Sequence, residues 1–326
     1  MKRLLCIGLI LCCMAGIFSG CGSDATEQTA EVQIEVPEGA TTTEIAALLK
    51  ENGIIKNEKK FIKESQKSGN DQKYKSGVAA LHGGMELEEI MEVLVNQMQP
   101  SGVKVTVPEG YNLDEITKLL VEKELIDEKE WKQELREGEF DYWFLKDAEL
   151  PKGTYRLEGF LFPDTYRVKA GASEHDIIDM MLKRFDTVYT QEYQDKAKEL
   201  GFSDLEILTL ASIIEKEASV DLDKISSVFH NRLKDPKYKY LESCATVIYV
   251  TGEKKDRLTL QDTKVKSPYN TYINPGLPPG PICSPGKAAI EAALYPAKTD
   301  YLFFSANGDG TNSFSKTYDE HLSKQP

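Results

Sequence analysis

Two glutamates follow an apolar helical stretch and are candidates for acid–base chemistry. Residues 208–214 are almost all apolar, and Glu215, Lys216 and Glu217 come next. Apolar surroundings raise the pKa of a carboxyl group, and a glutamic acid that keeps its proton near neutral pH can act as a general acid. At helical spacing Glu217 points about 200° away from Glu215, so the two cannot act on one bond as a pair. Spacing alone does not say which of them lies in a pocket, and the solvated end of a core helix fits the same pattern.

The elements around these glutamates are predominantly helical. Ser203 and Glu206 form a capping-box pattern that opens a helix over residues 204–218. Apolar spacing predicts further helices over residues 172–188, 191–200, 221–233 and 287–294. Aromatic and β-branched residues predict a strand and turn over 155–168 and a buried strand over 301–306, while the many Pro and Gly residues of 275–286 predict an ordered loop.

The first half of the sequence contains an internal repeat. The segment Ile34 to Gly39 recurs as Val105 to Gly110, and each copy runs from alternating apolar residues through Pro-Glu-Gly into helical spacing. We expect a strand, a turn and a helix in each copy. Residues 33–104 as a whole predict a strand, two helices, a strand and a helix. This layout resembles a LysM-type carbohydrate-binding module, and a purely structural packing domain fits it equally well.

Aromatic side chains in the second half suit a groove for sugars. The set is Tyr155, Phe160, Phe162, Tyr166, Tyr269 and Tyr272. Sugar rings stack their apolar faces on aromatic rings, while their hydroxyls bond to groups such as Asn270 and Thr271. The alternative is a place in the core, which we expect for about half of these aromatics, Phe160 and Phe162 first.

Composition and charge exclude some partners. The 326 residues carry a formal net charge of −13, which argues against nucleic acid because phosphates require clustered Lys and Arg. A glycan polymer is compatible with this charge. The spacing of Cys and His residues predicts neither a metal site nor a cofactor. Cys244 and Cys283 are either one disulfide or, as we favour, two free thiols.

The first residues have the features of a secretory signal. Lys2 and Arg3 precede an apolar run over residues 4–18, which is shorter than the roughly 20 residues that cross a bilayer. Ser-Gly-Cys then ends at Cys21, which resembles the lipobox of bacterial lipoproteins and predicts a signal peptide over 1–20, a lipid anchor at Cys21 and a polar linker over 21–32. An uncleaved signal anchor is the alternative. Both place the chain outside the cytoplasm, anchored at the membrane.

An ordered series of motifs carries a family resemblance. The segments are 157–166 (LEGFLFPDTY), 211–218 (ASIIEKEA), 228–233 (VFHNRL), 245–249 (ATVIY), 267–272 (SPYNTY), 276–282 (GLPPGPI) and 293–297 (ALYPA). Their order and spacing resemble the YceG-like (MltG) family of endolytic murein transglycosylases, from about residue 33 onward. One departure is Cys244-Ala245, where many relatives have Asp-Pro; the position is unfilled here or its role is taken by Glu242.

The resemblance implies a fold, a site and a reaction. The fold class is α+β, with a small LysM-like strand-helix module over 33–104 followed by a larger mixed α+β catalytic domain over 105–326. Glu215 is implied as the catalytic residue, and the substrate-binding residues implied are Glu158, Tyr269, Asn270, Thr271 and Tyr272. The implied partners are peptidoglycan glycan strands, the membrane through the N-terminal anchor, and peptidoglycan synthases.

The implied chemistry needs one acid. Glu215 would protonate the oxygen between MurNAc and GlcNAc, and as a carboxylate it would then take the proton of the MurNAc 6-hydroxyl to close a 1,6-anhydro ring. A glycoside hydrolase needs two carboxylates at a defined separation instead. The competing hypotheses are a non-catalytic peptidoglycan-binding envelope lipoprotein and an ordinary muramidase.

Overall fold

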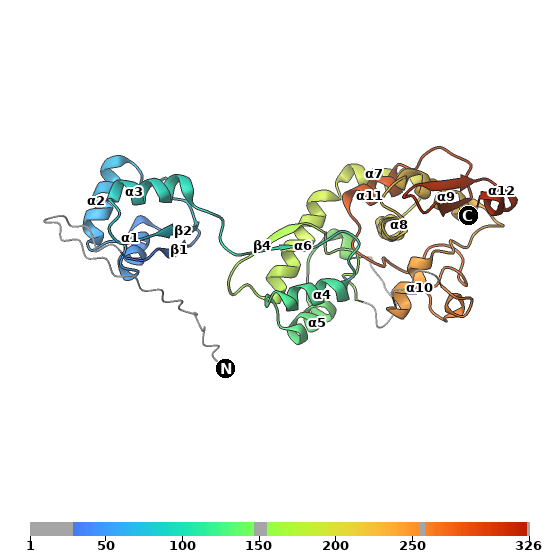
Figure 1. The fold of residues 1–326 in the computed structure, drawn as a ribbon, viewed down its shortest axis with the longest axis horizontal. Helices are drawn as coiled ribbons and strands as arrows, with labels where there is room; N and C mark the ends of the chain where they lie inside the picture. The colour runs from blue at the N-terminus through green and yellow to red at the C-terminus, as the bar shows by residue number, and fades with distance from the viewer. Residues whose placement is uncertain (1–28, 147–154, 254–257, 325–326) are drawn as a thin grey trace. The chain divides into compact units, whose positions relative to one another are not determined.

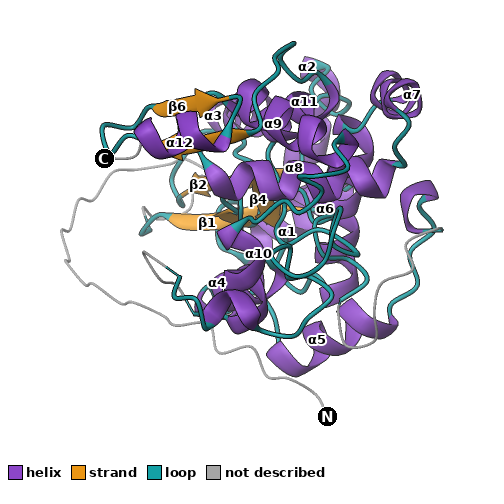
Figure 2. Ribbon diagram, turned by 90° about the vertical axis from the view of Figure 1, so that its right-hand side faces the viewer, coloured by secondary structure: helices purple, strands orange, loops and turns teal. Residues whose placement is uncertain are grey.

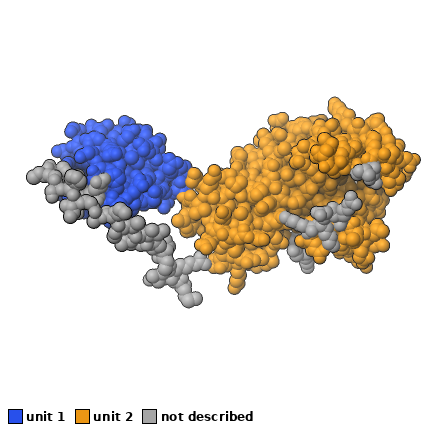
Figure 3. Space-filling model, viewed as in Figure 1, with its two compact units in different colours: residues 1–101 blue, residues 102–326 orange. Residues whose placement is uncertain are grey.

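The computed structural model describes residues 29–146, 155–253 and 258–324. The chain folds into two compact units, one ending at Ser101 and one beginning at Gly102 (Figure 3). The predicted signal peptide, Cys21 and most of the predicted linker lie outside the described residues. Within the described ranges, the helices are too short or too polar for any of them to cross a membrane.

The first unit is a two-stranded sheet with helices. Its elements are β1 (Val32–Val36), α1 (Thr42–Glu51), α2 (Glu58–Ser68), β2 (Gly77–Leu81) and α3 (Leu87–Glu92), which continues as a π-helical turn over Val93–Gln97 (Figure 1). β1 and β2 are antiparallel, with Val32 opposite Leu81. Ile34, Ile45 and Phe61 are buried between sheet and helices. The predicted order of strand, two helices, strand and helix is confirmed.

The second unit begins with the same arrangement. Its first elements are β3 (Val103–Thr106), α4 (Leu113–Glu122), α5 (Glu128–Glu137), a 3₁₀ turn over Trp143–Leu145, and β4 (Thr165–Val168), which pairs antiparallel with β3. Thr41 and Glu44 form the capping box of α1, and Asn112 and Glu115 form that of α4 at the matching positions of the repeat. The repeat in the sequence is therefore a repeat of structure.

Helices make up the remainder of the second unit, and its strands form short pairs (Figure 2). The elements are α6 (Glu174–Val188), α7 (Gln191–Leu200), α8 (Asp204–Glu217), α9 (Leu222–Lys234), α10 (Cys244–Thr251), a 3₁₀ turn over Asp262–Lys264, α11 (Lys287–Leu294), β5 (Phe303–Ala306), β6 (Asn312–Ser315) and α12 (Tyr318–Lys324). α8 packs against α7, α9, α10 and α11, and all its residues from Ile207 to Ile214 are buried. The fold class is α+β, as predicted.

Two strand predictions need correction. Residues 155–164 form turns, and only Thr165–Val168 is a strand. The strand predicted as buried over 301–306 begins at Phe303. Phe303 is the one buried residue of β5, because among the described residues this strand pairs only with β6 in a two-stranded hairpin. Helix α10 was not predicted, because its β-branched residues favour a strand by propensity. Contact of α10 with α8 outweighs that propensity.

Candidate active site

Helix α8 carries the two candidate glutamates at its carboxyl end. Ser203 accepts a hydrogen bond from the amide of Glu206, and the side chain of Glu206 accepts in return from the amide of Ser203, so the helix begins as the sequence predicts. Eight consecutive buried residues then hold the helix in the core. The helix ends at Glu217, because Ala218 adopts an extended conformation. Glu215 and Glu217 therefore lie where the core meets the loops around α8.

Glu215 is half-buried against the loop that precedes α11. Its Oε2 accepts a hydrogen bond of 3.0 Å from the amide of Gly286, the N-cap of α11. Its Cγ lies 3.5 Å from the position that a Cβ would take at Gly110. Burial raises the pKa of this carboxyl group, the bond from Gly286 lowers it, the charge of Glu109 raises it and that of Lys216 lowers it. The net direction is upward, as a general acid requires.

Glu217 faces a different part of the fold. Its carboxyl group is enclosed, although the residue as a whole is only half-buried, and accepts a 2.5 Å hydrogen bond from Ser243 Oγ at the start of α10. Burial raises the pKa of Glu217, and the bond from Ser243 partly opposes this. The two glutamates thus contact different segments, as helical spacing predicts.

A cavity of about 650 Å³ is lined by Lys216, the residue that follows Glu215. Its lining includes Lys216, Glu158 and Tyr249, with residues from the start of α4 and from α10, but Glu215 itself stands behind Gly110 and is not part of the lining. Lys216 Nζ donates a 3.1 Å bond to the carbonyl of Gly110, which joins the cavity wall to the turn that covers Glu215.

Glu158 is buried at this cavity, with 2% of its surface exposed. It accepts hydrogen bonds from the amide of Leu113 and from the hydroxyl of Tyr249, both at 3.2 Å. Burial raises the pKa of Glu158 to about 8, and these bonds partly counter that rise. Glu158 is therefore a neutral acid at neutral pH and lies at the cavity, and its substrate-binding role stays a prediction.

The other predicted substrate-binding residues fall into two kinds. Tyr269 lines the cavity, and Tyr272 is half-buried with its hydroxyl 3.1 Å from Cys244 Sγ. Asn270 and Thr271 are fully buried and bond within the protein. The amide of Asn270 donates to the carbonyls of Thr263 and Val265, and Thr271 Oγ1 accepts from the amide of Ser243. Asn270 and Thr271 thus shape the loop that carries the two tyrosines.

The aromatic residues divide much as expected. Phe160, Phe162 and Tyr166 are buried in the core of the second unit, while Tyr155 is half-buried and lines the cavity. Phe160 packs against Phe144 and Phe185. The segment 157–166 therefore supplies core packing through its phenylalanines and a cavity residue through Glu158.

The structure decides the state of the cysteines and shows what Glu242 contacts. Cys244 is exposed and Cys283 is buried, both as free thiols, so the disulfide alternative is wrong. Glu242 forms an ion pair of 2.9 Å with Arg232, whose guanidinium also donates to the carbonyls of Tyr240 and Leu241. Glu242 is therefore engaged in holding this chain segment.

Two residues near the candidate acid were not predicted from the sequence. Glu109 and Gly286 lie against each other, and both influence Glu215. The available signal was the Pro-Glu-Gly repeat, which marked Glu109 as part of a recurring turn without indicating its neighbours.

The fold and the site define an α+β protein whose second unit combines a strand-helix-helix-strand arrangement with packed helices and holds the half-buried carboxyl group of Glu215, with a cavity lined by the adjacent Lys216. The sequence profile of the YceG-like family matches residues 34–325, and the chain belongs to this family. It is 38% identical over 305 residues to the endolytic murein transglycosylase of Bacillus subtilis strain 168, covering 89% of this chain and 82% of that protein.

Two further comparisons agree with this assignment. The chain is 31% identical over 322 residues to the endolytic murein transglycosylase of Streptococcus pneumoniae strain D39, covering 89% of this chain but only 57% of that longer protein. The crystal structure of a YceG-like protein from Listeria monocytogenes is 33% identical, with a TM-score of 0.62, and the match covers 91% of this chain and 99% of that one.

Proposed function

We propose that this protein is an endolytic lytic transglycosylase of peptidoglycan, with Glu215 as its acid and base. One observation carries the assignment of the residue. Glu215 is a half-buried carboxyl group with a raised pKa that accepts a hydrogen bond from the amide of Gly286, and the next residue, Lys216, lines a cavity with a polar and aromatic lining. The family and its named relatives supply the substrate class.

The site supports both proton transfers. Burial favours the neutral acid, which donates its proton to the glycosidic oxygen between MurNAc and GlcNAc as that bond breaks. The amide of Gly286 then stabilises the carboxylate that forms. This carboxylate takes the proton of the MurNAc 6-hydroxyl while the oxygen of that hydroxyl bonds to the sugar carbon. This step closes the 1,6-anhydro ring and restores the acid.

Matched variants test the assignment of Glu215. Purified protein is incubated with glycan strands, and new ends are identified by mass spectrometry. We expect 1,6-anhydro ends from the wild type and from Glu217→Gln, whose amide oxygen still accepts the bond from Ser243, and none from Glu215→Gln. Equal product from Glu215→Gln would remove this residue from the mechanism. Reducing ends would identify a muramidase, and absence of cleavage by the wild type would favour the non-catalytic binding protein.

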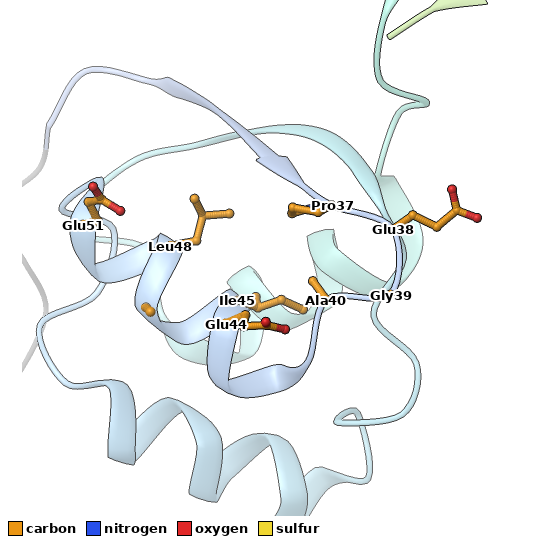
Figure 4. A pocket seen from close by; sticks show the side chains of 9 residues that line it. Pro37, Glu38, Gly39, Ala40, Glu44, Ile45, Leu48 and Glu51 are labelled. Atoms are coloured by element: carbon orange, nitrogen blue, oxygen red, sulfur yellow. The ribbon is translucent and has the colours of Figure 1, made fainter. Parts of the chain in front are cut away.

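The first unit has its own candidate site for glycan. A pocket of about 410 Å³ lies between the Pro37-Glu38-Gly39 turn and α1, with Leu48 and Ile45 beside acidic residues such as Glu51 (Figure 4). Its apolar surface with polar groups at the edge suits a sugar ring, and this supports a LysM-like role for residues 33–104. Replacing Ala47, which lines the pocket, with Trp should fill it and weaken retention on insoluble peptidoglycan. Unchanged retention would contradict a binding role.

The N-terminal sequence supports an anchor at the extracytoplasmic face of the membrane. Lipid attached at Cys21 predicts labelling of the chain by radioactive palmitate, lost in Cys21→Ser. Membrane association without labelling would identify residues 1–20 as an uncleaved signal anchor instead. The family resemblance also suggests action beside peptidoglycan synthases, which co-purification from membranes would test.

A further inference from the structure

The Pro-Glu-Gly turn has different surroundings in the two copies of the repeat. In the first unit Glu38 and Gly39 line an open pocket (Figure 4). In the second unit the amide of Gly110 donates to the carbonyl of Ser284 at 2.9 Å, and the amide of Ser284 donates to the carbonyl of Tyr111 at 2.8 Å. The second turn is therefore fixed against the loop that leads into α11.

This packing brings Glu109 into contact with Gly286. A Cβ built on Gly286 would lie 2.0 Å from Glu109 Oε1, a distance that no real Cβ could tolerate. The φ of Gly286 is −73°, an ordinary value for any residue, so a side chain at this position would conflict with the end of Glu109 and not with the backbone conformation. The amide of the same glycine donates to Glu215. Two carboxyl groups therefore meet at one glycine.

We propose that Glu109 is a positioning residue for the transglycosylase reaction, and that its carboxylate, which lies against Gly286, helps the half-buried Glu215 to keep its proton until a glycan receives it. This inference rests on the proposed function of Glu215. Glu109 acts through Glu215 and need not touch the substrate.

The charged and polar groups around Glu215 act in opposite directions. From the second Pro-Glu-Gly turn, the charge of Glu109 raises the pKa of Glu215. From α8 the ammonium of Lys216 lowers this pKa, and from the N-cap of α11 the amide of Gly286 lowers it too. Cys283 is the further titratable group nearby, and burial keeps this thiol protonated. Burial is the largest influence and raises the pKa of Glu215, and Glu109 is the charged neighbour whose effect adds to that of burial and opposes those of Gly286 and Lys216.

The expected effect is a shift of the pH profile with retained turnover. A general acid loses activity as pH rises through its pKa. Loss of the negative charge in Glu109→Gln should lower the pKa of Glu215 and so move the alkaline limb of the pH profile of kcat to lower pH. Glu109 is exposed, so solvent screens its charge, and we expect a shift of roughly half a pH unit. At pH values below the limb, kcat should stay within about twofold of the wild type.

Glu38→Gln is the matched control, because Glu38 holds the same place in the first copy of the repeat. Whatever its effect on KM, it should leave the alkaline limb unmoved. An unmoved limb in Glu109→Gln would overturn the proposal. So would complete loss of turnover at every pH, since that result would make Glu109 a catalytic group.

A second variant acts on the same contact from the other side. Gly286→Ala keeps an allowed backbone and the amide that bonds Glu215, but its methyl group must displace the flexible end of Glu109. It should move the limb in the same direction as Glu109→Gln. In a Glu109→Ala background, Gly286→Ala should cause no further shift, and an additional shift would contradict the proposed route through Glu109.

A titration without substrate separates this inference from the proposed function. The carboxyl carbon of Glu215 is followed by NMR in protein labelled at glutamate, and its resonance is assigned by its absence in Glu215→Gln. Its pKa should fall in Glu109→Gln and stay constant in Glu38→Gln. A lower pKa of Glu215 in Glu109→Gln, together with no 1,6-anhydro product from the wild type, would contradict the proposed function and leave the role of Glu109 intact. An unchanged pKa of Glu215 in Glu109→Gln, together with 1,6-anhydro product from the wild type, would contradict the role of Glu109 and leave the proposed function intact.

Discussion

Replacing Glu158 by Gln should make the second unit more stable at alkaline pH. The carboxyl group of Glu158 is buried, and its hydrogen-bond partners are the Leu113 amide and the Tyr249 hydroxyl. A glutamine has the same shape as the neutral acid and can accept from Leu113 while donating to the Tyr249 oxygen. The substitution therefore removes the titration and keeps the hydrogen-bonded arrangement.

The sign and size of the effect follow from the pKa of Glu158. The value is raised from 4.5 to about 8 in the folded protein, so the folded state holds a proton that the unfolded chain has lost. The contribution to stability is fully present below pH 4.5 and is lost as pH rises through 8. The full difference corresponds to about 5 kcal/mol. Glu158→Gln should gain several kcal/mol relative to the wild type between pH 5 and pH 9.

Urea unfolding followed by tryptophan fluorescence measures this difference. Trp131 and Trp143 are the two tryptophans of the chain and both belong to the second unit, so the signal reports that unit. Tyr249→Phe is the companion variant, because it removes a donor that favours the charged form and should steepen the wild-type pH dependence. Parallel stability curves for wild type and Glu158→Gln from pH 5 to pH 9 would refute the reasoning.

Three further outcomes are expected. Gly159→Ala should lose about 2 kcal/mol, seen as a lower urea midpoint, because φ is +86° and its Cβ would meet Pro281 at 2.5 Å; an unchanged midpoint would mean that the 157–164 turns yield easily. Asn270→Ala should cost about 1–3 kcal/mol by stranding the carbonyls of Thr263 and Val265, with KM unchanged; a higher KM at constant stability would assign Asn270 to substrate binding. Iodoacetamide should alkylate Cys244 in the folded protein and Cys283 only after unfolding, as read by peptide mass spectrometry; early alkylation of Cys283 would contradict its burial.

The parts of the fold that the sequence predicts are those fixed by local signals. Helix α8 begins at a capping box and continues through an unbroken apolar run, so its start and its burial follow from residues close in sequence. Helix α10 shows the limit. Its sequence of Ala, Thr, Val, Ile and Tyr favours a strand, and the helix packs against α8 and the 3₁₀ turn over Asp262–Lys264, which are distant in sequence or follow it.

The same distinction applies to the site. The helical spacing of Glu215 and Glu217 correctly separates the two carboxyl groups. Asn270 and Thr271 resemble sugar ligands in sequence because they are polar and lie between tyrosines, yet both are fully buried and bond to the chain itself. Sequence does not reveal whether a polar side chain satisfies a backbone group or a ligand, since that depends on segments brought together only by folding.

The repeated turn shows how packing, and not local structure, gives a carboxylate its chemical role. Glu38 and Glu109 occupy the same place in equivalent turns, each between a strand and a capped helix. Apart from the two residues adjacent in sequence, no heavy atom of the described residues lies within 4 Å of the position that a Cβ would take at Gly39. The equivalent position at Gly110 lies 3.5 Å from Glu215 Cγ. A carboxylate influences the proton of another only at short range and where water is partly excluded. The hydrogen bonds between the second turn and the loop before α11 bring Glu109 against Gly286, whose amide bonds the half-buried Glu215, whereas Glu38 lines an open pocket at the first turn.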